Sequence, residues 1–62
     1  MKELDVVRLT KNFKGIPTGT KGTIVSEYDG RCCEVEYVDN SGDTIDVVTT
    51  PIDILELEQQ YN

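Results

Sequence analysis

The sequence predicts an all-β domain of five short strands. Val, Ile and Thr are numerous, Gly or Pro interrupts the chain every few residues, and apolar and polar residues alternate over short runs. Such alternation has the period of two that belongs to a strand with one buried face, not the 3.6-residue period of a helix. We expect strands at residues 5–10, 23–28, 31–38, 44–49 and 54–57.

Turn signals lie between these predicted strands. Residues 11–20 are a polar loop containing Gly and Pro. Asp29-Gly30 predicts a two-residue hairpin turn, because Gly tolerates the positive φ of a type I′ turn. A five-residue turn is expected at residues 39–43 and a single 3-10 helical turn at residues 50–53, before the last strand. We expect residues 58–62 to be a frayed tail.

The turn at Asp29-Gly30 fixes a register between the second and third strands. It sets Ile24 opposite Val35 on an apolar face and Thr23 opposite Glu36 on the other face. It also sets Val25 opposite Glu34. One face is clearly apolar, so this register is self-consistent.

The five-residue turn fixes a second register, in which Val38 lies opposite Thr44. Val35 then lies opposite Val47, and Glu36 opposite Asp46. A turn of four residues is rejected because it would place Asp46 against the core. Facing carboxylates destabilise a strand pair by a few tenths to about 1 kcal/mol, so folding alone does not favour the Glu36–Asp46 pair.

We therefore expect an acidic outward face on the middle strands. It has three interpretations: a solvated surface that discourages edge-to-edge association, a docking surface for a basic protein, or a weak divalent-cation site. The candidate protein-binding residues on this face are Thr23, Val25, Glu27, Glu34, Glu36, Asp46 and Val48.

Charge is divided unevenly along the chain. All six Lys and Arg residues lie within the first 31 residues, whereas residues 32–62 hold eight of the twelve acids and no base. Long-range electrostatics selects partners more than it selects folds. With a formal net charge of −6, we expect a basic protein partner.

The polar first loop suggests an alternative partner. Basic residues interleaved with an aromatic ring can hold a phosphate backbone and stack a base. The candidate nucleic-acid-binding residues are Arg8, Lys11, Phe13, Lys14 and Lys21. The acidic half of the chain repels such a polymer, and lysines that merely keep the loop soluble explain the same pattern.

Size and composition argue against an enzyme. A chain of 62 residues forms one domain, for which we take residues 4–57 as the core, and buries only about 60% of its unfolded surface. A catalytic pocket would consume that core. The chain has no His, and its cysteines, Cys32 and Cys33, are adjacent, so we expect reduced thiols, no structural zinc and no cofactor. No apolar run reaches the length of a membrane span, and we expect a cytoplasmic protein without a membrane partner, monomeric or weakly dimeric through an edge strand.

Several segments carry a resemblance to a known family. They are Leu4-Asp5-Val6-Val7-Arg8-Leu9, Gly19-Thr20-Lys21-Gly22-Thr23-Ile24-Val25, Tyr28-Asp29-Gly30, Glu34-Val35-Glu36-Tyr37-Val38-Asp39 and Gly42-Asp43-Thr44. Over residues 4–57 the chain resembles an uncharacterised bacterial domain-of-unknown-function family of small stand-alone proteins, and the resemblance implies a five-stranded SH3-like barrel. More distantly, Gly19, Gly22, Ile24 and Val25 are similar to the glycine-rich strand entry of KOW-type modules, which bind RNA or polymerase-type proteins.

The sequence thus predicts a non-enzymatic, acidic protein-binding module. An accessory subunit, or an antitoxin- or immunity-like inhibitor of a basic enzyme, fits this description. The alternative is a KOW-like nucleic-acid or ribosome-associated module that uses the basic first loop.

Overall fold

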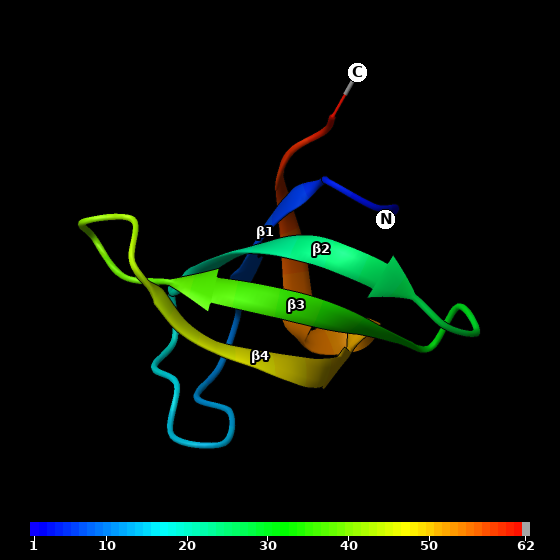
Figure 1. The fold of residues 1–62 in the computed structure, drawn as a ribbon. Helices are drawn as coiled ribbons and strands as arrows, with labels where there is room; N and C mark the ends of the chain where they lie inside the picture. The colour runs from blue at the N-terminus through cyan, green and yellow to red at the C-terminus, as the bar shows by residue number, and fades with distance from the viewer. Residues whose placement is uncertain (62) are drawn as a thin grey trace.

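The chain folds into one antiparallel sheet of five strands in the order β4-β3-β2-β1-β5. The computed structural model describes residues 1–61. Its elements are β1 (Val6–Leu9), β2 (Lys21–Glu27), β3 (Cys32–Val38), β4 (Thr44–Pro51), the 3-10 turn η1 (Ile52–Ile54) and β5 (Leu55–Gln59). The predicted all-β class, with five strands and one 3-10 turn before the last, is confirmed. The sheet bends so strongly that β1 and β5 cross behind β2, β3 and β4 at a steep angle (Figure 1).

The core lies inside this bend, between the two groups of strands. Buried and half-buried residues alternate along the whole of β3, as the period-two pattern predicts. Val7 on β1, Ile24 on β2 and Val35 on β3 are fully buried together with Tyr37. Strand β3 approaches β2 closely at Gly22, where an added Cβ would lie 2.5 Å from a methyl carbon of Val35.

The β2–β3 register matches the prediction only in the half far from the turn. There, Thr23 pairs with Glu36 and Ile24 with Val35, as predicted. Nearer the turn the register shifts by one residue at a bulge between Ile24 and Ser26. The predicted two-residue turn is wrong, because the backbone N–H of Tyr28 bonds the carbonyl of Cys32 and leaves three residues, 29–31, in the turn.

The bulge and the longer turn compensate one another. The Asp29 carboxylate accepts the N–H groups of Arg31 (3.0 Å) and Cys32 (3.2 Å), and Gly30 supplies a φ of +83°. This arrangement adds one residue to the turn, and the bulge in β2 adds one to the strand, so the apolar face stays continuous.

The β3–β4 register begins as predicted and then departs from the prediction. Val38 lies opposite Thr44, but a bulge at the next residue, Ile45, moves every later pair by one position. Asp46 therefore lies opposite Tyr37, and Val47 takes the predicted place of Asp46 opposite Glu36. The predicted Glu36–Asp46 opposition is wrong.

The last strand is longer than predicted and returns to β1. β5 runs to Gln59 and pairs with β1, placing Glu56 opposite Arg8 and Leu57 opposite Val7. Of the predicted frayed tail, residue 62 lies outside the described residues. The two ends of the described chain lie at the same side of the molecule (Figure 1).

Candidate functional site

The outward face of β3 carries two glutamates in fixed orientations. The Tyr28 hydroxyl donates to Glu34 Oε2 (3.1 Å), and Thr49 Oγ1 donates to Glu34 Oε1 (2.9 Å). Thr44 Oγ1 donates to Glu36 Oε2 (2.8 Å). Glu34 raises the pKa of Tyr28 by accepting this hydrogen bond and by its negative charge.

These glutamates define the candidate site, together with Thr23 and Val47. Thr23 lies opposite Glu36 on β2, and Val47 lies opposite Glu36 on β4 with 47% of its surface exposed. The name acidic face is used below for Thr23, Glu34, Glu36 and Val47. It carries negative charge beside one exposed apolar side chain.

Three of the predicted site residues lie elsewhere, because the two bulges change the faces of their strands. Glu27 lies opposite the buried Cys33. Asp46 lies opposite Tyr37 and uses its carboxylate to accept the N–H of Val47 (2.8 Å). Val48 packs against the core.

Val25, Thr23, Glu34 and Glu36 keep an outward or exposed position. Val25 lies in the β2 bulge and is 40% exposed. The prediction missed Val47 and the hydroxyl groups that hold the glutamates. Which face of β4 carries Thr44 and Thr49 depends on the bulge at Ile45, which lies between them. The sequence alone therefore does not show that their hydroxyl groups contact the glutamates.

The basic residues predicted to bind nucleic acid are divided between two places. Arg8 forms ion pairs with Glu56 (3.9 Å) and Glu58 on β5, and Lys21 pairs with Glu58 (3.6 Å). Two of the six cations of the first half of the chain, Arg8 and Lys21, thus meet acids of β5.

The first loop closes on itself at Phe13. Its backbone exchanges two hydrogen bonds with Ile16 (2.8 and 2.9 Å), and its ring packs against the core. The ammonium of Lys14 lies 5.4 Å from the centre of that ring. The Phe13 ring therefore has a structural role, because it packs against the core and lies near Lys14. Lys11 is exposed.

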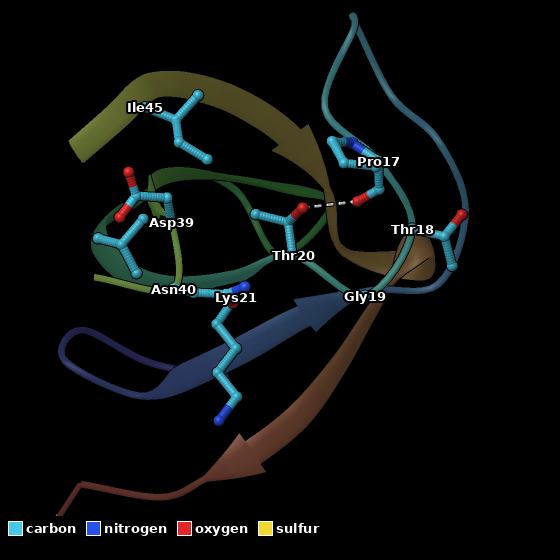
Figure 2. A pocket seen from close by; sticks show the side chains of 9 residues that line it. Pro17, Thr18, Gly19, Thr20, Lys21, Asp39, Asn40 and Ile45 are labelled. Atoms are coloured by element: carbon cyan, nitrogen blue, oxygen red, sulfur yellow. Dashed lines mark hydrogen bonds between the residues drawn. The ribbon is translucent and has the colours of Figure 1, made fainter. Parts of the chain in front are cut away.

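A groove lies between the first loop and the β3–β4 turn. Figure 2 shows Ile45 on β4 and Pro17 on the first loop at opposite sides of Thr20. The groove has a volume of about 500 Å³, and Val38 and Asp39 form part of its wall. Sequence patterns gave no signal for it, because it depends on the bulge at Ile45.

The two cysteines differ in environment. Cys33 is buried, and this burial raises the pKa of its thiol, with the neighbouring Cys32 and Glu27 acting in the same direction. A raised pKa leaves little thiolate at neutral pH, so Cys33 is a weak nucleophile. Cys32 is half-buried, and both thiols are free.

Asp5 is a buried carboxylate that no sequence pattern indicated. Only 2% of it is exposed, and it accepts the backbone N–H groups of Tyr61 (2.9 Å) and Lys2 (3.0 Å). These hydrogen bonds, that of Tyr61 foremost, hold the pKa of Asp5 below its usual value. Asp5 thereby ties the two ends of the chain to the start of β1.

Residues 1–61 contain no helix with the length and apolarity that crossing a membrane requires. Within the same residues, no three His, Cys, Asp or Glu side chains are grouped as metal ligands would be.

Comparison with known proteins confirms the resemblance to a domain-of-unknown-function family. Neither the curated proteins nor the solved structures include a match to the chain. A protein-family model described as domain of unknown function (DUF4926) matches residues 3–57, nearly the whole chain. The chain therefore belongs to the DUF4926 family.

Proposed function

We propose that this chain is a non-enzymatic binding module that contacts a basic partner protein through the acidic face. One observation carries the proposal: Glu34 and Glu36 are oriented by hydroxyl groups, yet neither takes part in any ion pair within residues 1–61. Their negative charge is available to a Lys or Arg of another protein.

The geometry supports recognition of paired cations. Glu34 and Glu36 are two residues apart on one strand, so their Cβ atoms are about 7 Å apart on the same face. Carboxylates already held by hydroxyl groups lose less side-chain entropy on binding than free ones do. Charge-assisted hydrogen bonds to Arg or Lys are stronger than neutral ones, and Val47 adds apolar contact area beside them.

The role that the acidic composition of the chain suggests is consistent with this proposal. A small acidic, SH3-like protein of the cytoplasm can serve as an accessory subunit, or as an antitoxin- or immunity-like inhibitor that covers a basic surface on an enzyme. The weak nucleophilicity of Cys33 and the lack of His in the sequence support a binding role over a catalytic one.

Nucleic-acid binding by a KOW-like module is the second candidate. The presence of Lys11 and Lys14 on the same exposed loop favours it. The pairing of Arg8 and Lys21 with acids of β5 weakens it, because a phosphate would have to displace those carboxylates.

A pull-down from the native host tests the first candidate. The Glu34→Lys/Glu36→Lys double variant reverses the charge of the acidic face, and it is expected to lose the partner that the wild-type chain recovers. Undiminished recovery of that partner by the double variant contradicts the proposal. Folding of the variant is checked by its circular dichroism spectrum and its unfolding midpoint.

Titration with nucleic acid tests the second candidate. Labelled single-stranded RNA and duplex DNA are titrated with protein at low salt, roughly 50 mM, where nonspecific phosphate contacts are strongest. The first candidate predicts no saturable binding with protein in the range of tens of micromolar, on the order of the tighter nonspecific affinities. Saturable binding that Lys11→Ala/Lys14→Ala removes supports the KOW-like candidate instead.

A further inference from the structure

The bulge in β4 directs one apolar side chain, that of Ile45, toward a groove. Ile45 is the extra residue of the bulge and is 48% exposed, and it lines the groove of about 500 Å³ together with Pro17. A single exposed apolar side chain is common on any protein. Ile45 differs because a bulge re-aims it toward a concave surface that Val38 and Pro17 also line.

The charged residues that line the groove are Asp39 and Lys21, and the ammonium of Lys21 is paired with Glu58. Asp39 lines it, and its Oδ1 atom accepts the N–H groups of Ser41 (2.9 Å) and Asp43 (3.0 Å), which hold the carboxylate in place. Asp46 directly follows Ile45. The ammonium of Lys21 leads away from the groove toward β5, where it pairs with Glu58 (Figure 2).

The groove also adjoins the acidic face. Val38 lies two residues beyond Glu36 on β3, so the two side chains share one face of that strand. A partner segment that follows β3 outward from Glu36 therefore reaches the groove.

We propose that the groove receives an aliphatic side chain from an extended segment of the basic partner. A Lys or Arg beside that aliphatic side chain meets the carboxylate of Asp39. This inference rests on the proposed function and names the part of the partner that gives it specificity.

A second copy of the chain is a poorer occupant. The Ile52 N–H bonds the Arg31 carbonyl, so in the alternating antiparallel ladder the odd-numbered residues of β4 direct their backbone groups to the free edge. At that edge the Val47 N–H is already taken by Asp46, and Pro51 has no N–H to offer.

Peptide titrations followed by two-dimensional NMR of the ¹⁵N-labelled full chain test this inference. The probes are a hexapeptide of alternating Lys and Leu and a matched hexapeptide of alternating Lys and Ser. The Lys–Leu peptide is expected to bind more tightly and to shift the amide signals of Gly19, Thr20 and Ile45. Equal affinity of the two peptides, shifts that avoid these residues, or no binding of the Lys–Leu peptide overturns the inference.

Matched variants locate the apolar contact. Ile45 and Val47 lie on the same strand with nearly equal exposure, 48% and 47%. Ile45→Thr is expected to weaken binding of the Lys–Leu peptide by roughly fivefold or more, and Val47→Thr, which changes the acidic face beside the groove, by a smaller factor. An effect of Val47→Thr equal to or larger than that of Ile45→Thr overturns the groove as the apolar contact.

A third variant separates this inference from the proposed function. Glu34→Gln/Glu36→Gln removes the charge of the acidic face without touching the groove. If it weakens both peptides while Ile45→Thr has no effect, the proposed function stands and the groove inference fails. If neither variant changes the affinity for either peptide, both fail.

Discussion

Two pairs of glutamates, each spaced two residues apart on a strand, are held by different groups. On β5, Glu56 and Glu58 face Arg8, and Glu58 also meets Lys21. On β3, Glu34 and Glu36 meet only hydroxyl groups among the interactions of residues 1–61. The β5 pair is neutralised within the fold, whereas the β3 pair is oriented but not neutralised.

This difference shows where the basic and acidic residues, which are distributed unevenly along the sequence, lie in the folded chain. Part of the basic first half meets part of the acidic second half across β1 and β5, where the pairing helps to hold the last strand. Three further acids, Glu34, Glu36 and Asp46, lie on β3 and β4, and none of them forms an ion pair within residues 1–61. We therefore propose a structural role for the β1–β5 side and a binding role for the acidic face.

Gly22 joins the two regions, and its substitution is expected to have the largest effect. It pairs with Val7 on one side and Tyr37 on the other. In Gly22→Ala the added Cβ would lie 2.5 Å from a Val35 methyl carbon and 3.0 Å from the carbonyl oxygen of Glu36. The side-chain and backbone shifts that this overlap forces are expected to lower the free energy of unfolding by about 1–3 kcal/mol.

Chemical denaturation measures that effect, with Thr23→Ala on the adjacent outward position as the control. The control is expected to change stability by less than about 0.5 kcal/mol, as surface substitutions usually do. A Gly22→Ala variant as stable as the control would mean that β2 and β3 are not packed as tightly as the structure shows.

Asp5 probes the β1–β5 side through pH. The pKa of Asp5 is lowered in the folded chain, mainly by the Tyr61 N–H, below its ordinary value of 3.8. The carboxylate therefore stabilises the fold above about pH 4, and this contribution is lost as pH falls through the folded pKa. Asp5→Asn is expected to lower the unfolding midpoint at about pH 6 and to flatten its decline between about pH 5 and pH 2.

Asp39 serves as the comparison for that titration. Hydrogen bonds from the Ser41 hydroxyl and from backbone N–H groups also lower its pKa, so Asp39→Asn removes an acid-sensitive contribution from the turn next to the acidic face. Loss of Asp5 is expected to loosen the chain ends, seen as faster amide exchange at Tyr61, and loss of Asp39 is not. Equal exchange at Tyr61 in the two variants contradicts the role given to Asp5.

The smallest expected effect compares the two glutamate pairs directly. Glu58→Gln removes a carboxylate that pairs with Arg8 and Lys21, and its cost is expected to be about 0.2–1 kcal/mol at low salt and less at high salt. Glu34→Gln keeps an acceptor for Tyr28 or Thr49 and relieves repulsion, so it is expected to be neutral or slightly stabilising. Denaturation in low and high salt measures both, and a larger loss in Glu34→Gln reverses the assignment of the two pairs.

The strands and the apolar face were predictable because period-two alternation reports burial directly. Val38 opposite Thr44 followed correctly from the length of the turn. The bulge at Ile45 could not be predicted, since Ile45, Val47 and Val48 offer apolar residues to both faces of β4 and either register buries some of them. That one residue decided whether Asp46 or Val47 belongs to the acidic face.

The site was predictable where it depended on one strand and not where it depended on long-range contacts. Glu34 and Glu36 alternate with buried neighbours, so their outward position follows from β3 alone. The burial of Asp5 depends on the backbone N–H of Tyr61, 56 residues away, and a backbone donor has no signature in the sequence.

Quantitative capture of the native partner by two neutralised variants tests the central claim most directly. Glu34→Gln/Glu36→Gln and Glu56→Gln/Glu58→Gln each remove two carboxylates at the same spacing, and both are compared with the wild-type chain at equal folded concentration. We predict that the β3 variant recovers far less of the basic partner, and that the β5 variant recovers nearly the wild-type amount although it is less stable. Full recovery by the β3 variant, or a greater loss in the β5 variant, would contradict the assignment of the acidic face to binding.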